Sequence, residues 1–565
     1  MRIPCIGRAA WFLPVLLAAP MLLPLAAKNR AKSPVSAEQP ESPEVTSILN
    51  RVIASEAQYN QKIKEYSPRV ETYLQYYEPD KELGDVARND AHFLGRVQFD
   101  KDAREVSFTA SEGVISWLRH GPSTVTGHVA PHLNVNDFAI EPLTLDKDSF
   151  DRQHYTFEPV RWEYLGDVRC LAIDVHPREH PHVGSFEGRI WVEDHNYQIV
   201  RLNGVRVHPP HMAFYVHFDC WRENLQPGVW LPVYVYSQES ELGKRLRYKA
   251  ETRLWGYDLT AHRQQQEWTN ILVDAPAPVR DSSEVTSDYT PLESQRQLTI
   301  DAEHNVLDRL EKARLIAPPG PLDKVLETVV NNLRVTNHLD NLPPIQCRVM
   351  LSSTLESFSL AYTIVLSRGL IDVLPDEPSL AMIMAHELAH IALGHKLNTK
   401  YAFNDRLLIS DERVLTSLDL ARDRKDEEAA DAKGIEFLKN SPYASQLAQA
   451  GLFLRAAADA APHVPSMFGA HLGNGLLEGN KVIRMEALIA ASPALAPKRV
   501  DQIAALTLGS RVQVNAWDGS VAFTTRKAVP IADASEKLPF RVTPVVPYLR
   551  PYAPLTPKAE VRAQN

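Results

Sequence analysis

The sequence predicts an α+β protein of several domains, in which an antiparallel β domain resembling a half-barrel is followed by a mainly α-helical domain. Its 565 residues exceed the usual domain size of about 100–200 residues. Period-two alternation of apolar and polar residues dominates up to about residue 273, and beyond it the period changes to 3.6. Many strands in a row with few helices between them favour a large curved antiparallel sheet over a parallel α/β domain.

The first 30 residues have the layout of a secretory signal. Arg2 and Arg8 precede an apolar stretch at 9–27, and three basic residues follow it. We therefore expect export to the periplasm or to the outside of the cell. Three prolines in the stretch argue against a membrane-spanning helix, whereas its end is a poor cleavage site. Both a cleaved signal peptide and an uncleaved anchor that holds the protein near a membrane stay open.

The predicted β domain covers residues 43–273. A helical pattern at about 43–62 comes first, and Leu171, Ile173 and Val175 then share one face of a strand. Further strand candidates are 186–192, 197–207, 214–218, 233–235 and 246–254.

Charge and cysteine content exclude two classes of function. Lys and Arg number 61 against 70 Asp and Glu, and the net charge of -9 is spread without long runs, so we expect no nucleic-acid partner. The spacing of Cys170, Cys220 and Cys347 matches no zinc knuckle or redox pair. Cys170 and Cys220 either form a disulfide in an oxidising compartment or are buried as small apolar side chains.

The helical domain is predicted at 301–505, after a linker at 274–300 that begins with a stretch rich in proline and small polar residues. Apolar residues between Leu322 and Leu333 recur with helical spacing, which indicates one buried helix face. Residues 506–565 combine a short β piece, with a turn at Asp518-Gly519, and a proline-rich tail expected to be extended or disordered. Since the chemistry-bearing residues lie beyond the linker, we expect the helical domain to work without residues 31–272.

The strongest local signal is His386-Glu387-Leu388-Ala389-His390, within an apolar helical pattern that begins near Pro378. Histidines at positions i and i+4 lie about 6 Å apart along one face of a helix, so two imidazoles can reach one zinc ion. Glu387 lies about 100° round the helix, where it can act on a water at the metal. The alternative is a core helix that carries two satisfied histidines.

A third ligand is expected in the acidic helical pattern at 425–434. Glu427 and Asp431 share one face of this helix, with Glu427 as the ligand and Asp431 as the acceptor of a hydrogen bond from a ligand histidine. Glu428 lies about 100° away and points elsewhere. Gly434 lets the helix approach its partner closely. The alternative is a solvated acidic helix start.

The His-Glu-x-x-His segment followed along the chain by the acidic segment at 425–434 resembles the zinc metallopeptidase family that includes CAAX prenyl endopeptidases, HtpX-like heat-shock proteases and periplasmic quality-control proteases (peptidase family M forty-eight). The resemblance covers about 300–490 and also includes the strand and Gly-Leu at 364–371, a trailing histidine at His395 and the E-x-x-x-D spacing. It implies a zincin-type metallopeptidase domain that hydrolyses protein or peptide substrates. The implied centre holds one Zn²⁺ per chain, with metal ligands His386, His390 and Glu427, catalytic base Glu387 and neighbouring carboxylate Asp431.

Three other features of the resemblance leave alternatives open. His395, nine positions after His386, is expected on nearly the opposite helix face in a structural role. His471 and Arg484 are candidates for a lid histidine and an oxyanion-side arginine, against ordinary surface roles. Residues 356–363 depart from the family's substrate-edge segment, which leaves the substrate preference open, although an extended substrate is expected to add a strand beside 363–367.

The β-rich region resembles the outer-membrane lipoprotein-sorting (LolA/LolB-like) half-barrel at residues 166–175 and 186–192. A generic β accessory domain is the other interpretation. The resemblance supplies a competing function, in which the chain carries a lipid or lipoprotein and the peptidase domain is inactive. An exported quality-control protease is the favoured interpretation. An inactive peptidase domain usually loses a ligand or the base, and here all five residues of the implied site are present.

Overall fold

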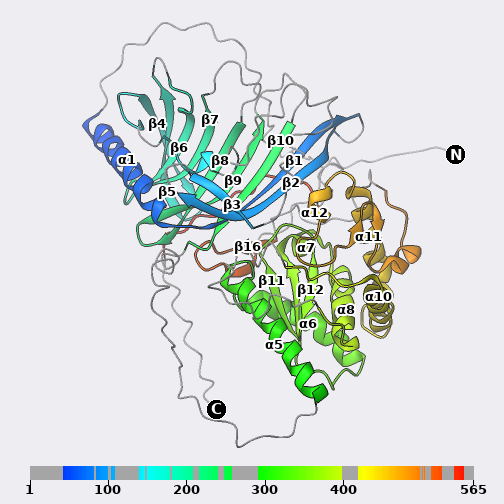
Figure 1. Ribbon diagram of the computed structural model, residues 1–565. Coiled ribbons are helices and arrows are strands. Elements are labelled where there is room, and N and C mark those ends of the chain that lie inside the picture. The colour runs from blue at the N-terminus through cyan, green and yellow to red at the C-terminus, as the bar shows by residue number, and fades with distance from the viewer. Residues whose placement is uncertain are drawn as a thin grey trace, which may run out of the picture. The chain divides into compact units, whose positions relative to one another are not determined.

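The computed structural model describes fifteen stretches of the chain, drawn as ribbons in Figure 1. They are 42–81, 84–99, 103–108, 138, 140–146, 149–178, 181–207, 216–239, 247–257, 291–397, 418–496, 499, 502, 511–524 and 540–552. The predicted signal or anchor at 1–30 lies outside them. Among the helices in these stretches, none is both long and apolar enough to cross a bilayer.

A ten-stranded antiparallel sheet forms the N-terminal half, and the predicted α+β class is confirmed (Figure 1). Its order is β3-β2-β1-β10-β9-β8-β7-β6-β5-β4, so β1 pairs with the last strand of the sheet, β10. The strands are β1 (Arg69–Asp80), β2 (Gly84–Phe99), β3 (Ala103–Ser107), β4 (Tyr155–Leu165), β5 (Val168–Pro177), β6 (Phe186–Glu193), β7 (Ile199–Arg206), β8 (Val216–Gln226), β9 (Val229–Glu239) and β10 (Arg247–Trp255).

Helix α1 (Pro43–Lys62) is tied to the sheet by a buried ion pair. Both carboxylate oxygens of Glu56 accept hydrogen bonds at 2.8 Å from Arg222 of β8, the paired geometry in which arginine binds a carboxylate best. In the sheet, Cys170 and Cys220 are free and buried, which matches the second of the two expectations for them.

The C-terminal half is mainly helical and encloses a small sheet of order β11-β13-β12 (Figure 1). Helix α6 contacts β11, and α8 contacts β12. Its elements are α5 (Pro291–Lys312), α6 (Pro321–Thr336), β11 (Gln346–Met350), β12 (Ser357–Leu360), β13 (Thr363–Ser367), α7 (Arg368–Val373), α8 (Glu377–Leu393), α10 (Arg424–Lys439), α11 (Leu447–Ala460), α12 (Pro465–Phe468), β14 (Leu477–Glu478), β15 (Lys481–Val482), β16 (Val512–Val514) and β17 (Val521–Phe523).

One boundary and the burial of the C-terminal segment differ from the sequence-based expectation. Helix α5 begins at Pro291, so residues 291–300 of the predicted linker are helical, because proline suits the first turn of a helix. The proline-rich segment 540–552 has no regular secondary structure, but Phe540, Val542 and Leu549 are buried. The predicted β piece is present as β16 and β17, with Gly519 at a φ of 75° in the turn between them.

The two halves share a buried polar network. Glu71 of β1 accepts hydrogen bonds from the hydroxyl of Ser353 at 2.9 Å and from Arg368 of α7 at 2.9 Å, and its other oxygen lies 2.8 Å from His92 of β2. A single cluster of buried apolar residues likewise includes Trp221 of the sheet and Leu388 of α8. These contacts argue against a helical domain that works without residues 31–272. Removing the sheet would expose the apolar cluster and would take from Arg368 its partner Glu71.

Candidate metal centre

Helix α8 carries the His-Glu-x-x-His motif in the interior of the protein. Its start is capped by Asp376, whose side chain accepts from the backbone N–H of Ser379 at 2.9 Å, and its end is set by Gly394 in the left-handed region. His386, Glu387 and His390 are each at most 1% exposed. The apolar run around the motif therefore reflects a helix buried on nearly all sides.

His386, His390 and Glu427 bring three ligand atoms to one point. The Nε2 atoms of the two histidines lie 3.0 Å apart, and the Glu427 carboxylate oxygens lie 3.2 Å from Nε2 of His386 and 3.3 Å from Nε2 of His390. With zinc bonds of about 2.0–2.1 Å, two ligands of a tetrahedral ion lie about 3.3 Å apart. The spacing of these three groups fits a zinc ion.

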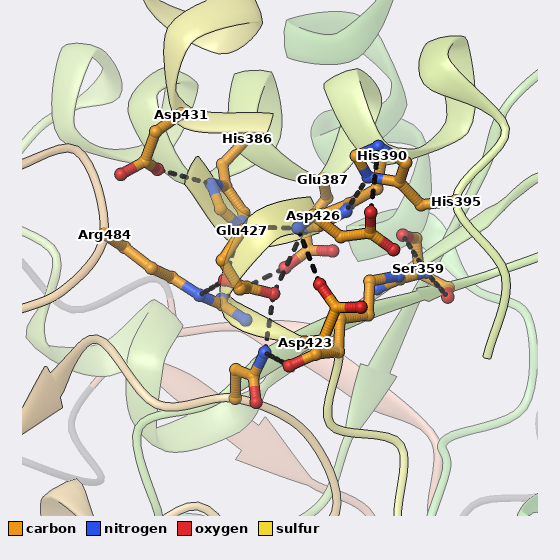
Figure 2. A network of polar contacts seen from close by, with 12 residues as sticks. Ser359, His386, Glu387, His390, His395, Asp423, Asp426, Glu427, Asp431 and Arg484 are labelled. Atoms are coloured by element: carbon orange, nitrogen blue, oxygen red, sulfur yellow. Dashed lines mark hydrogen bonds and ion pairs between the residues drawn. The ribbon is translucent and has the colours of Figure 1, made fainter. Parts of the chain in front are cut away.

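Helix α10 supplies Glu427 and orients it (Figure 2). Asp423 caps its start by accepting from Asp426 N–H at 2.9 Å, and Glu427 then faces the histidines of α8. Glu428 points to solvent and pairs with exposed Arg424 at 2.9 Å. At Gly434 a Cβ atom would lie 3.1 Å from the backbone carbonyl of Ala385 in α8, so a side chain there would push the helices apart.

The outer nitrogens of both histidines have partners. Asp431 Oδ1 lies 2.8 Å from Nδ1 of His386, and Nδ1 of His395 lies 2.8 Å from Nδ1 of His390 (Figure 2). The expected position of His395 on the opposite helix face is wrong, because the helix ends before it: Gly394, at a φ of 68°, turns the chain back under His390. A glycine directly after a long apolar helical pattern is the signal that could have revealed this.

Glu387 is held by one oxygen only. Its Oε1 accepts hydrogen bonds from Ser357 Oγ at 2.7 Å and from Arg484 Nη1 at 3.2 Å. Among the residues that the structure describes, its buried Oε2 has no hydrogen-bond partner. A buried carboxylate oxygen without a donor is costly unless a ligand or water uses it. Arg484 also donates to Glu427 Oε2 at 3.0 Å, so it links Glu387 to Glu427.

Two residues of the site were missed from the sequence. Ser357 contacts Glu387, and Asn474 donates to Glu427 Oε1 at 2.6 Å. Ser357 directly follows Glu356, and Asn474 lies three residues after His471. Neither a lone serine nor a lone asparagine carries a spacing pattern, so their neighbours were the available signal.

His471 lies away from the three ligands. Its Nε2 atom is 3.0 Å from Nδ1 of His92 in the buried network, and the two rings are stacked. Its backbone N–H donates to Glu356 Oε2 at 3.1 Å. In the described part of the chain, the contacts of the His471 ring run to the sheet rather than to the metal ligands. Arg484, in contrast, lies at the centre of the site.

The charges of His390 and of the two carboxylates match the protonation states that metal binding needs. Burial and the charge of Arg484 lower the pKa of His386, but its hydrogen bonds with Asp431 and Glu427 outweigh them and raise it. Burial lowers the pKa of His390 to about 4, so its imidazole is neutral at pH 7 and can offer a lone pair. Burial raises the pKa of the Glu427 carboxyl, but the charge of Arg484 and the contacts with both histidines outweigh this and lower it. Burial also raises the pKa of Glu387, and the Arg484 and histidine charges again reverse the shift. Both carboxylates are therefore ionised at neutral pH.

The expected position for a substrate strand beside 363–367 is wrong. That segment is β13, the middle strand of its sheet, and its edges are already paired with β11 and β12. The two edge strands are β11 and β12, and β12 carries Ser357. On β12 the carbonyl of Ser359 accepts a hydrogen bond from Arg422 at 2.8 Å.

One segment of the chain, which includes helix α8, matches a known protein family. Residues 322–410 match the model of Peptidase family M48, which confirms the resemblance stated above for this part of the chain. Glu427 and Asp431 lie beyond the matched residues, so their assignment depends on the geometry. No curated protein matches the chain. Among solved structures, a DUF1329 family protein from Desulfovibrio piger is 11% identical, with 38% of this chain and 93% of that chain covered and a TM-score of 0.20.

Proposed function

We propose that this protein is a zinc-dependent endopeptidase. The observation that supports it most is the juxtaposition of three ligand atoms at zinc-like spacing with the buried Oε2 of Glu387, which has no hydrogen-bond partner among the described residues. The match to Peptidase family M48 supports the same class of enzyme. His386, His390 and Glu427 would hold one Zn²⁺ per chain and leave a fourth position for water or substrate.

Bound zinc would supply Lewis acidity, which polarises a peptide carbonyl and lowers the pKa of water. Glu387 accepts a proton from the attacking water at Oε2 and then returns it to the leaving amine. Ser357 and Arg484 hold Oε1 and so fix the orientation in which Oε2 faces the reaction. The positive charge of Arg484 keeps Glu387 ionised, and it is positioned to stabilise negative charge that develops nearby.

The proposed substrates are proteins or peptides bound in extended form. The edge strand β12 offers the backbone groups of Ser357 and Ser359 for pairing. Because Arg422 donates to the Ser359 carbonyl and Arg484 to the Ser357 carbonyl, a substrate strand would have to replace both contacts.

Export and a role in quality control are further parts of the proposal, and they rest on the composition of residues 1–30 and on the family resemblance. The same segment supports a periplasmic or secreted protein that lies close to a membrane when the segment is uncleaved. The evenly spread net charge of -9 supports a protein without a nucleic-acid partner. The competing carrier function needs an inactive peptidase domain. The complete ligand set favours an active centre instead, as does Glu387 Oε2, for which the described part of the chain provides no hydrogen-bond donor.

Metal content and cleavage of casein by the purified full chain, with and without a chelator, test the proposal. We expect about one zinc per chain and chelator-sensitive cleavage. Glu387→Gln should keep the zinc but reduce hydrolysis to background, because an amide cannot act as a base. Glu436→Gln, at an exposed position of α10, is the matched control. Full activity of Glu387→Gln, or a wild-type chain that takes up no zinc, would overturn the proposal.

A further inference from the structure

The Nδ1 atoms of the two proposed histidine ligands contact different chemical groups. Nδ1 of His386 faces a carboxylate, that of Asp431, at 2.8 Å. Nδ1 of His390 faces another imidazole nitrogen, Nδ1 of His395, also at 2.8 Å. A carboxylate can only accept, so it fixes the proton on His386, whereas an imidazole nitrogen can either donate or accept.

We propose that His395 is a positioning residue which fixes the tautomer of His390, by accepting a hydrogen bond from its Nδ1–H. The inference rests on the proposed function in so far as it takes Nε2 of His390 to be a metal ligand. A neutral imidazole that offers Nε2 to a metal carries its proton on Nδ1. Because the two Nδ1 atoms are 2.8 Å apart, the Nδ1 atom of His395 must then be the acceptor.

The same reasoning places the remaining proton of His395. If Nδ1 of neutral His395 accepts, its proton is on Nε2. That atom lies 3.7 Å from Oδ1 of Asp426, in the first turn of α10. The distance is longer than a direct hydrogen bond, so Asp426 acts through its charge, which favours the ring orientation with the proton toward it. Asp426 and Glu427 are adjacent in α10. The helix therefore provides Glu427 as a proposed ligand and also orients His395, the partner of His390.

The backbone sets this arrangement before any metal binds. Gly394 ends α8 in the left-handed conformation that only glycine adopts readily, and the N–H of His395 donates to the His390 carbonyl at 3.1 Å. Continued helix would have carried position 395 away from His390. No atom of His395 belongs to the group of ligand atoms that could hold the ion, so a direct ligand role does not explain its position.

The zinc affinity of full-chain variants tests the inference, measured by competition with a chromophoric chelator. His395→Leu removes the acceptor while keeping an apolar side chain of similar size, and we expect zinc binding to weaken about 10–100-fold. His395→Asn can place its amide oxygen near the position of Nδ1, and affinity should return to within about threefold of wild type. Lys396→Ala, an exposed neighbour, is the control with unchanged affinity.

Thermal unfolding of the metal-free proteins separates positioning from folding, since a purely structural role would lower stability equally with and without zinc. If His395→Leu does not fold, His395→Ala takes its place with the same expectation. The d–d spectrum of the cobalt-substituted wild type and His395→Leu should differ, which reports a changed ligand orientation. Equal zinc affinity of wild type and His395→Leu, or no recovery in His395→Asn, overturns the inference alone. A wild-type chain without zinc affinity overturns the proposed function with it.

Discussion

Glu71 and Arg368 stand 297 positions apart in the chain, and yet a carboxylate oxygen of Glu71 lies 2.9 Å from Nη2 of Arg368, with both side chains at most 2% exposed. Arg368 also donates to Asp372 at 3.1 Å. Because neither charge meets water, the pair is costly to break from one side. It joins β1 of the large sheet to α7, the helix that directly follows the small sheet of the metal centre.

Glu71→Gln should therefore lower the free energy of unfolding by about 3 kcal/mol at pH 7, the lower end of the range for a broken buried pair, because Arg368 retains Asp372. Glu78→Gln, whose exposed partner is Arg88, is the matched control and should change it by about 0.5 kcal/mol or less. Urea unfolding of the metal-free chain measures both. Equal stabilities of the two variants would contradict the role of the buried pair.

The same substitution should show a defined pH dependence. Burial raises the pKa of Glu71, but the His92 hydrogen bond and the Arg368 charge lower it from 4.5 to about 2 in the folded chain. A depressed folded-state pKa gives stability that is complete above the unfolded pKa and is lost as the pH falls through the folded pKa. The difference between wild type and Glu71→Gln should thus be constant above about pH 5 and shrink between pH 4.5 and 2. A difference that grows toward low pH would contradict this.

Removing the large sheet should unfold the helical half. A chain of residues 291–565 would expose Arg368 and the apolar surface that meets the sheet, so we expect it to aggregate and to lose zinc binding. Co-expression with residues 43–290 should restore a zinc-binding complex, which is the control for the break in the chain. A soluble 291–565 fragment with wild-type zinc affinity would instead restore the expectation from the sequence.

The class of fold was accessible from the sequence because it depends on local periodicity. Alternation in segments such as 200–206 and helical spacing at 322–333 each follow from which face is buried. The joint between the halves was not accessible, since Glu71 has no local signal: on a strand, a lone glutamate reads as a solvent-facing residue, and only its distant partners show otherwise.

The site divides in the same way. His386, Glu387 and His390 lie on one helix with a fixed spacing, and Glu427 with Asp431 on another, so helical geometry alone predicts their faces. His395 was misplaced because the helical period was extended past Gly394, where the helix ends. Ser357 is the first residue of strand β12, and Asn474 lies outside the helices and strands, so no periodic pattern marks either residue.

Adjacent Glu427 and Glu428 should differ sharply on substitution. Glu427→Ala should lose zinc affinity and activity together, because it removes one of the three proposed ligands, whereas exposed Glu428→Ala should keep both to within a few-fold. Asp431→Ala should weaken zinc binding about 10–100-fold, since it releases only the outer nitrogen of His386. Chelator competition on the three variants measures this. Loss of zinc in Glu428→Ala would show that the register of α10 is wrong.

Gly434→Ala tests the contact between the two helices that carry the ligands. Alanine is favoured over glycine inside a helix by about 1 kcal/mol, so an open position would become more stable. Here the new Cβ would meet Met485 Cε at 2.5 Å, which can move, but also the backbone carbonyl carbon and oxygen of Ala385 at 3.1 Å, which can yield only if α8 and α10 separate. Overpacking of this kind costs about 1–3 kcal/mol, enough to outweigh the gain in helix propensity.

Because the separation also moves Glu427 away from the histidines, we expect the zinc affinity of Gly434→Ala to fall together with its stability. Lys433→Ala on the exposed side should alter neither appreciably. Urea unfolding of the metal-free proteins and chelator competition measure the two effects, and a stabilised Gly434→Ala variant with wild-type zinc affinity would show that the helices are not in backbone contact at this point.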